Sequence, residues 1–191
     1  YKIVLILFLQ IYLAQQLPIP TLAPVAQVRF SKDAFAAYPQ QISVGNNSLS
    51  VVYSRQPSYF AIHYQQPTKV EGAILELNNG AIAVFPGQPD STQIQQIVSP
   101  VYTSQPEGSL AVPTGMIFIR FTEGVEVEQQ REAIAQAGYK ITQILAYAPH
   151  AAWLSAASGK IADALTGVSK LQAIPNVENV EPQMLMERSR R

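Results

Sequence analysis

Residues 114–191 carry the pattern that most restricts how this chain can fold, because apolar runs of strand and helix length alternate there with stop signals. An apolar, β-rich run at 115–121 follows Pro113 and ends before a glycine-containing turn. A Glu-, Gln- and Ala-rich stretch at 126–137 then predicts a helix, which Gly138 ends as a C′ glycine. The stretch therefore begins as a strand followed by a helix.

The remainder of this region predicts a hairpin, a second helix and a last strand. Apolar runs at 140–147 and 151–157 are separated by residues 148–150, a connection that suits only an antiparallel turn. Ser158 can cap a helix whose apolar residues recur at helical spacing, and a Pro-Asn pair separates it from a strand at 177–181. This order predicts the α+β fold class, with a C-terminal ferredoxin-like βαββαβ domain whose two helices cover one face of a four-stranded sheet.

Four pieces of this region resemble one protein family. They are Gly115–Phe121, Ala137–Tyr139, Leu171–Val177 and Val180–Pro182, and they follow one another in the order typical of the prodomain of secreted bacterial subtilisin-type serine proteases. The resemblance is strong from Thr114 to Pro182 and extends more weakly upstream. It covers the prodomain alone, so we expect no catalytic domain.

The resemblance implies a protein that inhibits a subtilisin-like protease or assists its folding. In that family the open sheet face docks on the protease, and the C-terminal tail lies in the substrate cleft like a product. The docking face would include Phe118, Arg120, Tyr147 and Trp153. The basic tail, residues 183–191, would contribute Met184, Leu185, Met186 and Arg188. The family often has an acidic residue in the central hairpin turn, and this chain has none there.

The titratable residues argue against an enzyme. The sequence contains no cysteine, two histidines and three aspartates, and neither His63 nor His150 lies in a triad signature. No metal-ligand spacing and no glycine-rich phosphate loop occurs, so we expect no cofactor and no metal. We expect His63 to point outward from a strand into solvent, and His150 to lie in a surface turn. The chain is therefore interpreted as non-catalytic.

The N-terminal residues predict export. An apolar run of signal-peptide length, residues 3–14, follows Lys2. It is shorter than the roughly 20 apolar residues of a membrane span. Two alternatives stay open for residues 1–16, a cleaved signal peptide or a retained membrane tether. In a tether the membrane-facing residues would be Ile3, Leu5, Leu7, Phe8, Ile11 and Leu13. Either way we expect a periplasmic or extracellular protein, or one held on the non-cytoplasmic side of a membrane.

Between these ends we predict a proline-rich linker at 17–24 and a β-rich domain at 25–105. An alternative is a degenerate copy of the C-terminal unit. Strand candidates are 49–53, 59–64, 73–77, 81–85 and 99–102, and a short helix candidate is 90–97. Asn78-Asn79-Gly80 predicts a type I′ hairpin turn.

Charge and composition favour a protein partner over a nucleic acid. Thirteen basic and thirteen acidic residues cancel, and low charge with nine tyrosines is typical of interface cores. The leading hypothesis is an exported protein-binding domain that acts on a subtilisin-like protease. The alternative is a structural accessory subunit of a larger membrane or envelope complex, tethered by residues 3–14.

Overall fold

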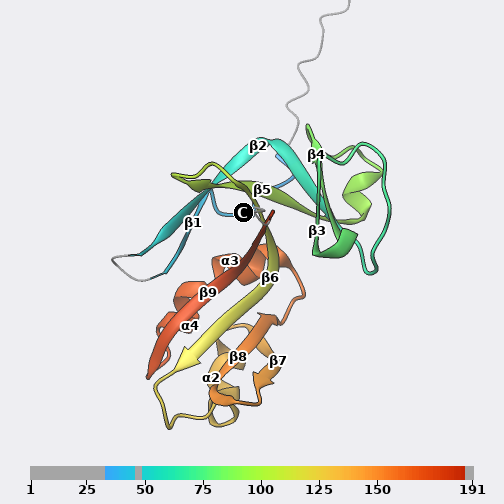
Figure 1. Ribbon diagram of the computed structural model, residues 1–191. Coiled ribbons are helices and arrows are strands. Elements are labelled where there is room, and N and C mark those ends of the chain that lie inside the picture. The colour runs from blue at the N-terminus through green and yellow to red at the C-terminus, as the bar shows by residue number, and fades with distance from the viewer. Residues whose placement is uncertain (1–32, 46–48, 188–191) are drawn as a thin grey trace, which may run out of the picture. The chain divides into compact units, whose positions relative to one another are not determined.

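The computed structural model describes residues 33–45 and 49–187, and strands dominate this part of the chain (Figure 1). The strands are β1 (Gln41–Val44), β2 (Val51–His63), β3 (Leu75–Leu77), β4 (Ile82–Pro86), β5 (Ile97–Gln105), β6 (Leu110–Phe121), β7 (Tyr139–Leu145), β8 (Ala148–Ala156) and β9 (Val177–Met186). The α-helices are α2 (Arg131–Gln136), α3 (Ile161–Thr166) and α4 (Val168–Gln172), and the 3-10 turns are η1 (Asn78–Gly80), η2 (Gln93–Gln95) and η3 (Val127–Gln130). The predicted membrane-facing residues 3–14 and the linker 17–24 lie outside the described residues.

All the described strands join one antiparallel sheet. Its order is β3-β4-β2-β5-β6-β8-β7, with β1 paired to β2 and β9 paired to β6. β6 holds this sheet together: its first residues pair with β5, its last residues pair with β8, and β9 follows its other side. As a result, the boundary predicted between a β-rich domain and a C-terminal domain is crossed by one continuous strand.

The predicted fold class, with a ferredoxin-like βαββαβ domain, is wrong. The chain is mostly antiparallel sheet with few helices. The predicted strand at 115–121 begins at Leu110, and the predicted strand at 177–181 continues to Met186. These extensions pair with each other and connect to β5, so the segment is not a separate α+β unit.

The helices are shorter than predicted. The segment 126–137 forms η3 and the six-residue α2, and Gly138 follows it with a φ of 92°, as a C′ glycine requires. The second helix is divided into α3 and α4 at Gly167, where an added Cβ would lie 2.6 Å from Tyr139 Oη. Ser158 does not occupy the N-cap position, which belongs to Lys160.

Both predicted hairpins are present, with different turns. The β7–β8 hairpin turns at residues 146–147, because Leu145 pairs with Ala148, and residues 148–150 belong to β8. In the β3–β4 hairpin the predicted Asn-Asn-Gly residues all have positive φ, but Leu77 pairs with Ile82, so the connection has four residues.

Three upstream predictions need correction. The separate strands predicted at 49–53 and 59–64 are one strand, β2, whose register shifts between Arg55 and Phe60. The helix predicted at 90–97 is only the 3-10 turn η2, with Asp90 Oδ1 accepting hydrogen bonds from the backbone of Thr92 and Gln93. The alternative of a degenerate second α/β copy does not fit a segment made of strands and 3-10 turns.

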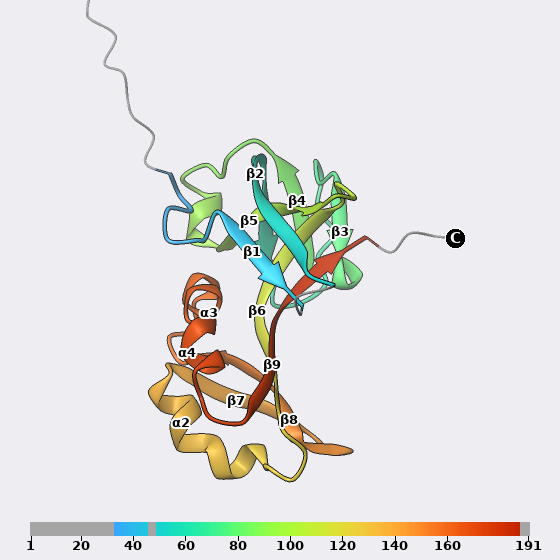
Figure 2. The ribbon, with the colours of Figure 1, turned by 90° about the vertical axis from the view of Figure 1, so that its left-hand side faces the viewer.

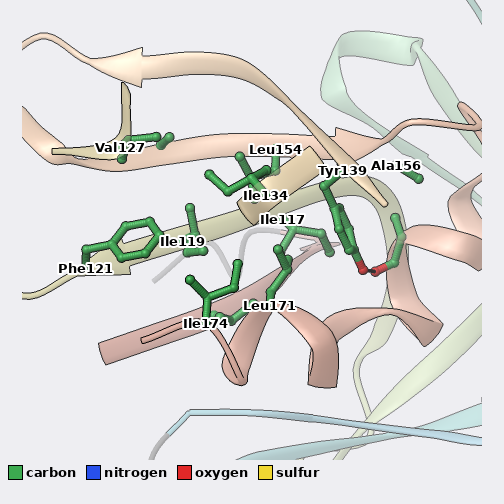
Figure 3. Packing of buried hydrophobic residues seen from close by; sticks show 13 residues of the cluster. Ile117, Ile119, Phe121, Val127, Ile134, Tyr139, Leu154, Ala156, Leu171 and Ile174 are labelled. Carbon is green, nitrogen blue, oxygen red and sulfur yellow. Dashed lines mark hydrogen bonds between the residues drawn. The ribbon is translucent and has the colours of Figure 1, made fainter. Parts of the chain in front are cut away.

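Two faces of β6 bury apolar side chains in different places. Ile117, Ile119 and Phe121 point toward α2 and α4, where they pack with fully buried side chains such as Ile134 and Leu171 (Figure 3). Burial of one such side chain stabilises the fold by about 1.5–3 kcal/mol. Nearer its start, β6 contributes to two further clusters, one with α3 and one with β2, β3 and β4.

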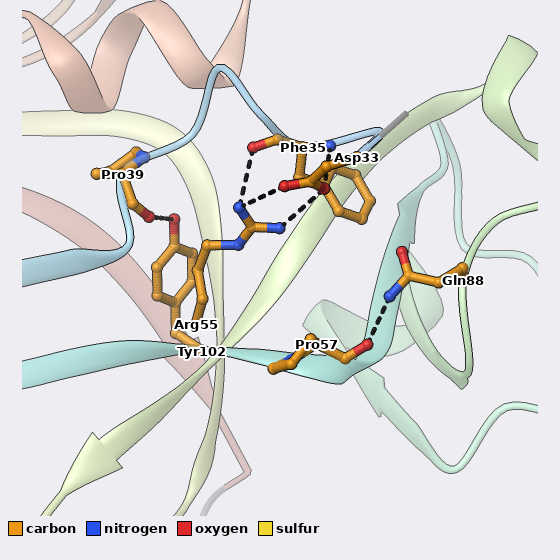
Figure 4. A network of polar contacts seen from close by, with 7 residues as sticks. All are labelled: Asp33, Phe35, Pro39, Arg55, Pro57, Gln88 and Tyr102. Carbon is orange, nitrogen blue, oxygen red and sulfur yellow. Dashed lines mark hydrogen bonds and ion pairs between the residues drawn. The ribbon is translucent and has the colours of Figure 1, made fainter. Parts of the chain in front are cut away.

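Residues 33–39 are fastened to β2 and β5 by polar contacts (Figure 4). Arg55 donates hydrogen bonds to both carboxylate oxygens of Asp33, at 3.1 and 3.2 Å, and to the carbonyl of Phe35 at 3.2 Å. Tyr102 Oη donates to the carbonyl of Pro39 at 2.8 Å. The hydrogen bond that Asp33 accepts from Arg55 holds the pKa of the Asp33 carboxyl below its usual value. These contacts cover the cluster around Phe35, Phe60 and Ile62.

Candidate protein-binding face

The second face of the β6–β8–β9 region is the candidate site. Because side chains alternate along a strand, the residues between Ile117, Ile119 and Phe121 point away from the helices. Figure 2 shows α2, α3 and α4 on one side of β6 and β9. We call the opposite side the helix-free face, since no helix of the described residues packs on it. It comprises Met116, Phe118 and Arg120 of β6, Trp153 of β8, and Glu181 and Gln183 of β9.

An aromatic pair lies at the centre of the helix-free face. Phe118 and Trp153 are directly opposite one another on neighbouring strands. Their ring centroids are 5.4 Å apart with an interplanar angle of 63°, an edge-to-face arrangement. Such pairs add about 0.5–1.5 kcal/mol beyond their area burial. Both rings are only half-buried, so each offers apolar surface to a partner.

Polar groups surround the aromatic pair. Arg120 Nε lies 3.3 Å from Glu178 Oε2, and both side chains are more than two-fifths exposed. Asn179 Nδ2 donates a hydrogen bond to Glu181 Oε1 at 2.8 Å. An apolar centre within a polar rim is the usual composition of a protein–protein interface.

The structure brings together only some of the residues predicted to bind a partner. Phe118, Arg120 and Trp153 share the helix-free face, whereas Tyr147 lies at the tip of the β7–β8 hairpin and is 85% exposed. The remaining four were assigned to a tail. Of these, Met184, Leu185 and Met186 lie in β9, and Arg188 lies outside the described residues.

The first part of the predicted tail is therefore structural. Met184 packs against the cluster that includes α3, and Leu185 packs on the other side of β9 against the cluster formed with β2 and β4. Met186 pairs with Ala111 and is 37% exposed. These residues form strand because β6 supplies a pairing partner, which the sequence of 183–186 does not reveal.

A pocket of about 360 Å³ adjoins the helix-free face. Its walls include Met116 and Gln183 from the face and Thr114 from β6. The other walls come from His63 at the end of β2, from Tyr64 after it, and from Asn78 in the β3–β4 hairpin. The pocket lies beside a bulge, because β6 has two more residues than β9 between the pairs Pro113–Met184 and Ile117–Pro182. Gly115 allows this bulge with a φ of 86°.

His63 is not the solvated histidine that we predicted. It is largely buried at the end of β2, with Nε2 2.8 Å from Ser99 Oγ, and burial lowers its pKa to about 4. Ser99 is fully buried, so its hydroxyl is out of reach of a substrate. His150 lies in β8 and not in a turn. The pair His63–Ser99 is thus a satisfied internal hydrogen bond.

No group of three His, Cys, Asp or Glu residues close enough to hold a metal ion occurs within 33–45 and 49–187. Across those same ranges, every helix is too short or too polar to cross a bilayer. Comparisons of the chain with protein-family models, with curated proteins and with solved structures found no match.

Proposed function

We propose that this protein is a non-catalytic, exported protein-binding domain that docks its helix-free face on a subtilisin-type serine protease, as an inhibitor or a folding chaperone. The observation that supports the proposal is the half-buried Phe118–Trp153 pair, flanked by polar groups, on a sheet face without a helix among the described residues. The choice of a protease as the partner rests on the sequence resemblance of residues 114–182.

The aromatic pair has the properties of an energetic hot spot. Binding energy at interfaces is concentrated in a few side chains, and Trp is among the most enriched types. Trp153 and Phe118 are already positioned by β8 and β6, so docking would cost little side-chain entropy. Arg120 and Glu181 lie in the rim, where charges affect the association rate more than the affinity.

The position of β9 changes which residues could enter a protease cleft. Met184, Leu185 and Met186 are paired with Pro113, Val112 and Ala111, so these three cannot reach a cleft without breaking the sheet. Of the residues assigned to the tail, Arg188 is the one that remains for this role. The proposal therefore assigns docking to the face and cleft contact to the residues after Glu187.

The test is an inhibition assay of the full chain against secreted subtilisin-type proteases. We expect Trp153→Ala to weaken inhibition by about 30-fold or more, as removal of a hot spot of at least 2 kcal/mol requires. Arg120→Glu is a second face variant, at an exposed side chain. Arg131→Ala, an exposed change on α2, is the matched control and should leave inhibition unchanged.

Two outcomes would overturn the proposal. One is an absence of inhibition by the natural chain at micromolar concentration with folded protein confirmed by circular dichroism. The other is equal inhibition by the natural chain and both face variants. Co-purification with subunits of a membrane complex, in place of a protease, would instead support the accessory-subunit hypothesis.

A further inference from the structure

The pocket is continuous with the helix-free face. Met116 and Gln183 belong to both, and Thr114 lies on the same side of β6 as Phe118. A partner chain that covers the Phe118–Trp153 pair would therefore pass the mouth of the pocket. The next side chain along that partner chain could then enter the pocket.

The chemistry of the walls excludes a charged occupant. Asp, Glu, Lys and Arg are absent from the lining, and His63 stays neutral at physiological pH because its burial disfavours the protonated form. A charge that enters such a site loses part of its hydration without gaining a counter-ion, which disfavours its binding.

The polar groups in the pocket are oriented and have spare hydrogen-bonding capacity. Thr114 Oγ1 donates to Gln183 Oε1 at 2.8 Å and accepts a hydrogen bond from the backbone N–H of Met116 at 3.1 Å, which fixes the Gln183 amide. Within the described residues, Gln183 Nε2 and the side-chain amide of Asn78 take part in no other hydrogen bond. Ile82 and Leu185 supply apolar walls beside these groups.

We infer that this pocket is a specificity subsite that receives one uncharged side chain of the bound partner, with an apolar body and a hydrogen-bonding tip, as in glutamine or tyrosine. The inference rests on the proposed function, since it takes the partner to be a protein. A volume of about 360 Å³ accommodates one such side chain without rearrangement of the strands.

The test uses capped amino acids as probes of the isotope-labelled full chain by NMR. N-acetyl-glutamine amide should shift the side-chain amide signals of Gln183 and Asn78 with a dissociation constant on the order of millimolar. The isosteric but charged N-acetyl-glutamate amide should bind at least about tenfold more weakly. N-acetyl-tyrosine amide should likewise bind more tightly than N-acetyl-phenylalanine amide, which lacks the hydrogen-bonding tip.

A matched pair of variants locates the effect. Gln183→Leu should weaken binding of the glutamine probe and abolish the preference for the tyrosine probe over the phenylalanine probe, whereas Gln129→Leu, an exposed change in η3, should leave both unchanged. Equal shifts from charged and neutral probes, or no shift at about 20 mM of either neutral probe, would overturn the subsite. Because these readouts use no protease, failure here with intact protease inhibition removes the subsite and leaves the proposed function in place.

Discussion

At the residue scale, His63 links the pocket to the pH dependence of stability. Its folded-state pKa of about 4 lies below the ordinary value of 6.5, so the folded state disfavours the protonated form. Above pH 6.5 the histidine is neutral in the folded and the unfolded state, so the folded state keeps its full stability. That stability is lost progressively as pH falls from 6.5 toward 4, because the unfolded chain binds the proton first. We expect a loss of at most about 3 kcal/mol from this residue over that interval, measured by urea unfolding at successive pH values.

A neutral replacement isolates this effect. His63→Gln keeps a side chain that can hydrogen-bond Ser99 and should flatten the stability profile between pH 6.5 and 4. His150→Gln serves as the control and should retain the slope. If the His63→Gln profile keeps the full slope, the pH dependence arises elsewhere.

Gly167 is a second residue whose identity is set by one contact. An added Cβ would approach Tyr139 Oη to 2.6 Å, and this hydroxyl already donates a hydrogen bond to the carbonyl of Ala164 at 2.6 Å. We expect Gly167→Ala to lower the free energy of unfolding by about 1–3 kcal/mol, since the buried ring must move. The loss should be smaller in a Tyr139→Phe background, and a double-mutant cycle measures the difference. A gain in stability from Gly167→Ala would show that α3 and α4 can merge, which would contradict this account.

At the element scale, the attachment of residues 33–39 depends on Arg55. Its side chain is only 9% exposed, and it bonds to Asp33 and to the Phe35 carbonyl. We expect Arg55→Leu to lower the free energy of unfolding by about 1–3 kcal/mol, because it leaves these acceptors without their donor. Amide hydrogen exchange should then accelerate at 33–39 before it changes elsewhere.

The matched control for this prediction is Arg131→Leu. That residue also pairs with a carboxylate, Glu128, but on the exposed surface of α2 and η3, and its loss should have no measurable effect on stability. Exchange at 33–39 that stays slow in Arg55→Leu would show that the aromatic contacts of Phe35 hold the segment without the arginine.

Individual elements were predictable where a residue type forces the backbone. The Asn-Asn-Gly turn and the Gly138 helix end are of this kind, because positive φ is required at each. Element lengths were not predictable. β6 and β9 extend beyond their apolar runs because each pairs with the other, and such pairing between distant segments leaves no local signal.

At the scale of the whole molecule, one sheet predicts one unfolding transition. The described strands are connected through β6, and Val84 in β4 is fully buried in a cluster that also includes Leu185 of β9. We expect Val84→Ala to lower the free energy of unfolding by about 2 kcal/mol. The transition followed by fluorescence of Trp153 in β8 should shift as much as the transition followed by circular dichroism. Two separated transitions would mean that the β2–β5 part and the β6–β9 part unfold independently.

The candidate site was predictable only in part. The family resemblance assigned Phe118, Arg120 and Trp153 to one sheet face, and the pairing of β6 with β8 brings these three residues together. The pocket could not be predicted, because His63 and Gln183 are far apart in the sequence and meet only through the course of the sheet. No motif marks either residue.

The bulge in β6 has a consequence for how the chain tolerates insertions. Between the pairs Pro113–Met184 and Ile117–Pro182, β6 advances four positions while β9 advances two. The surplus is an even number, so inward and outward positions keep the same parity before and after the bulge. Deletion of one residue at 114–115 would leave an odd surplus, and Phe118 and Ile119 would keep their faces only if a one-residue bulge formed, as in β7 between Ile141 and Gln143. Removal of both residues would restore an uninterrupted ladder with every side chain on its original side.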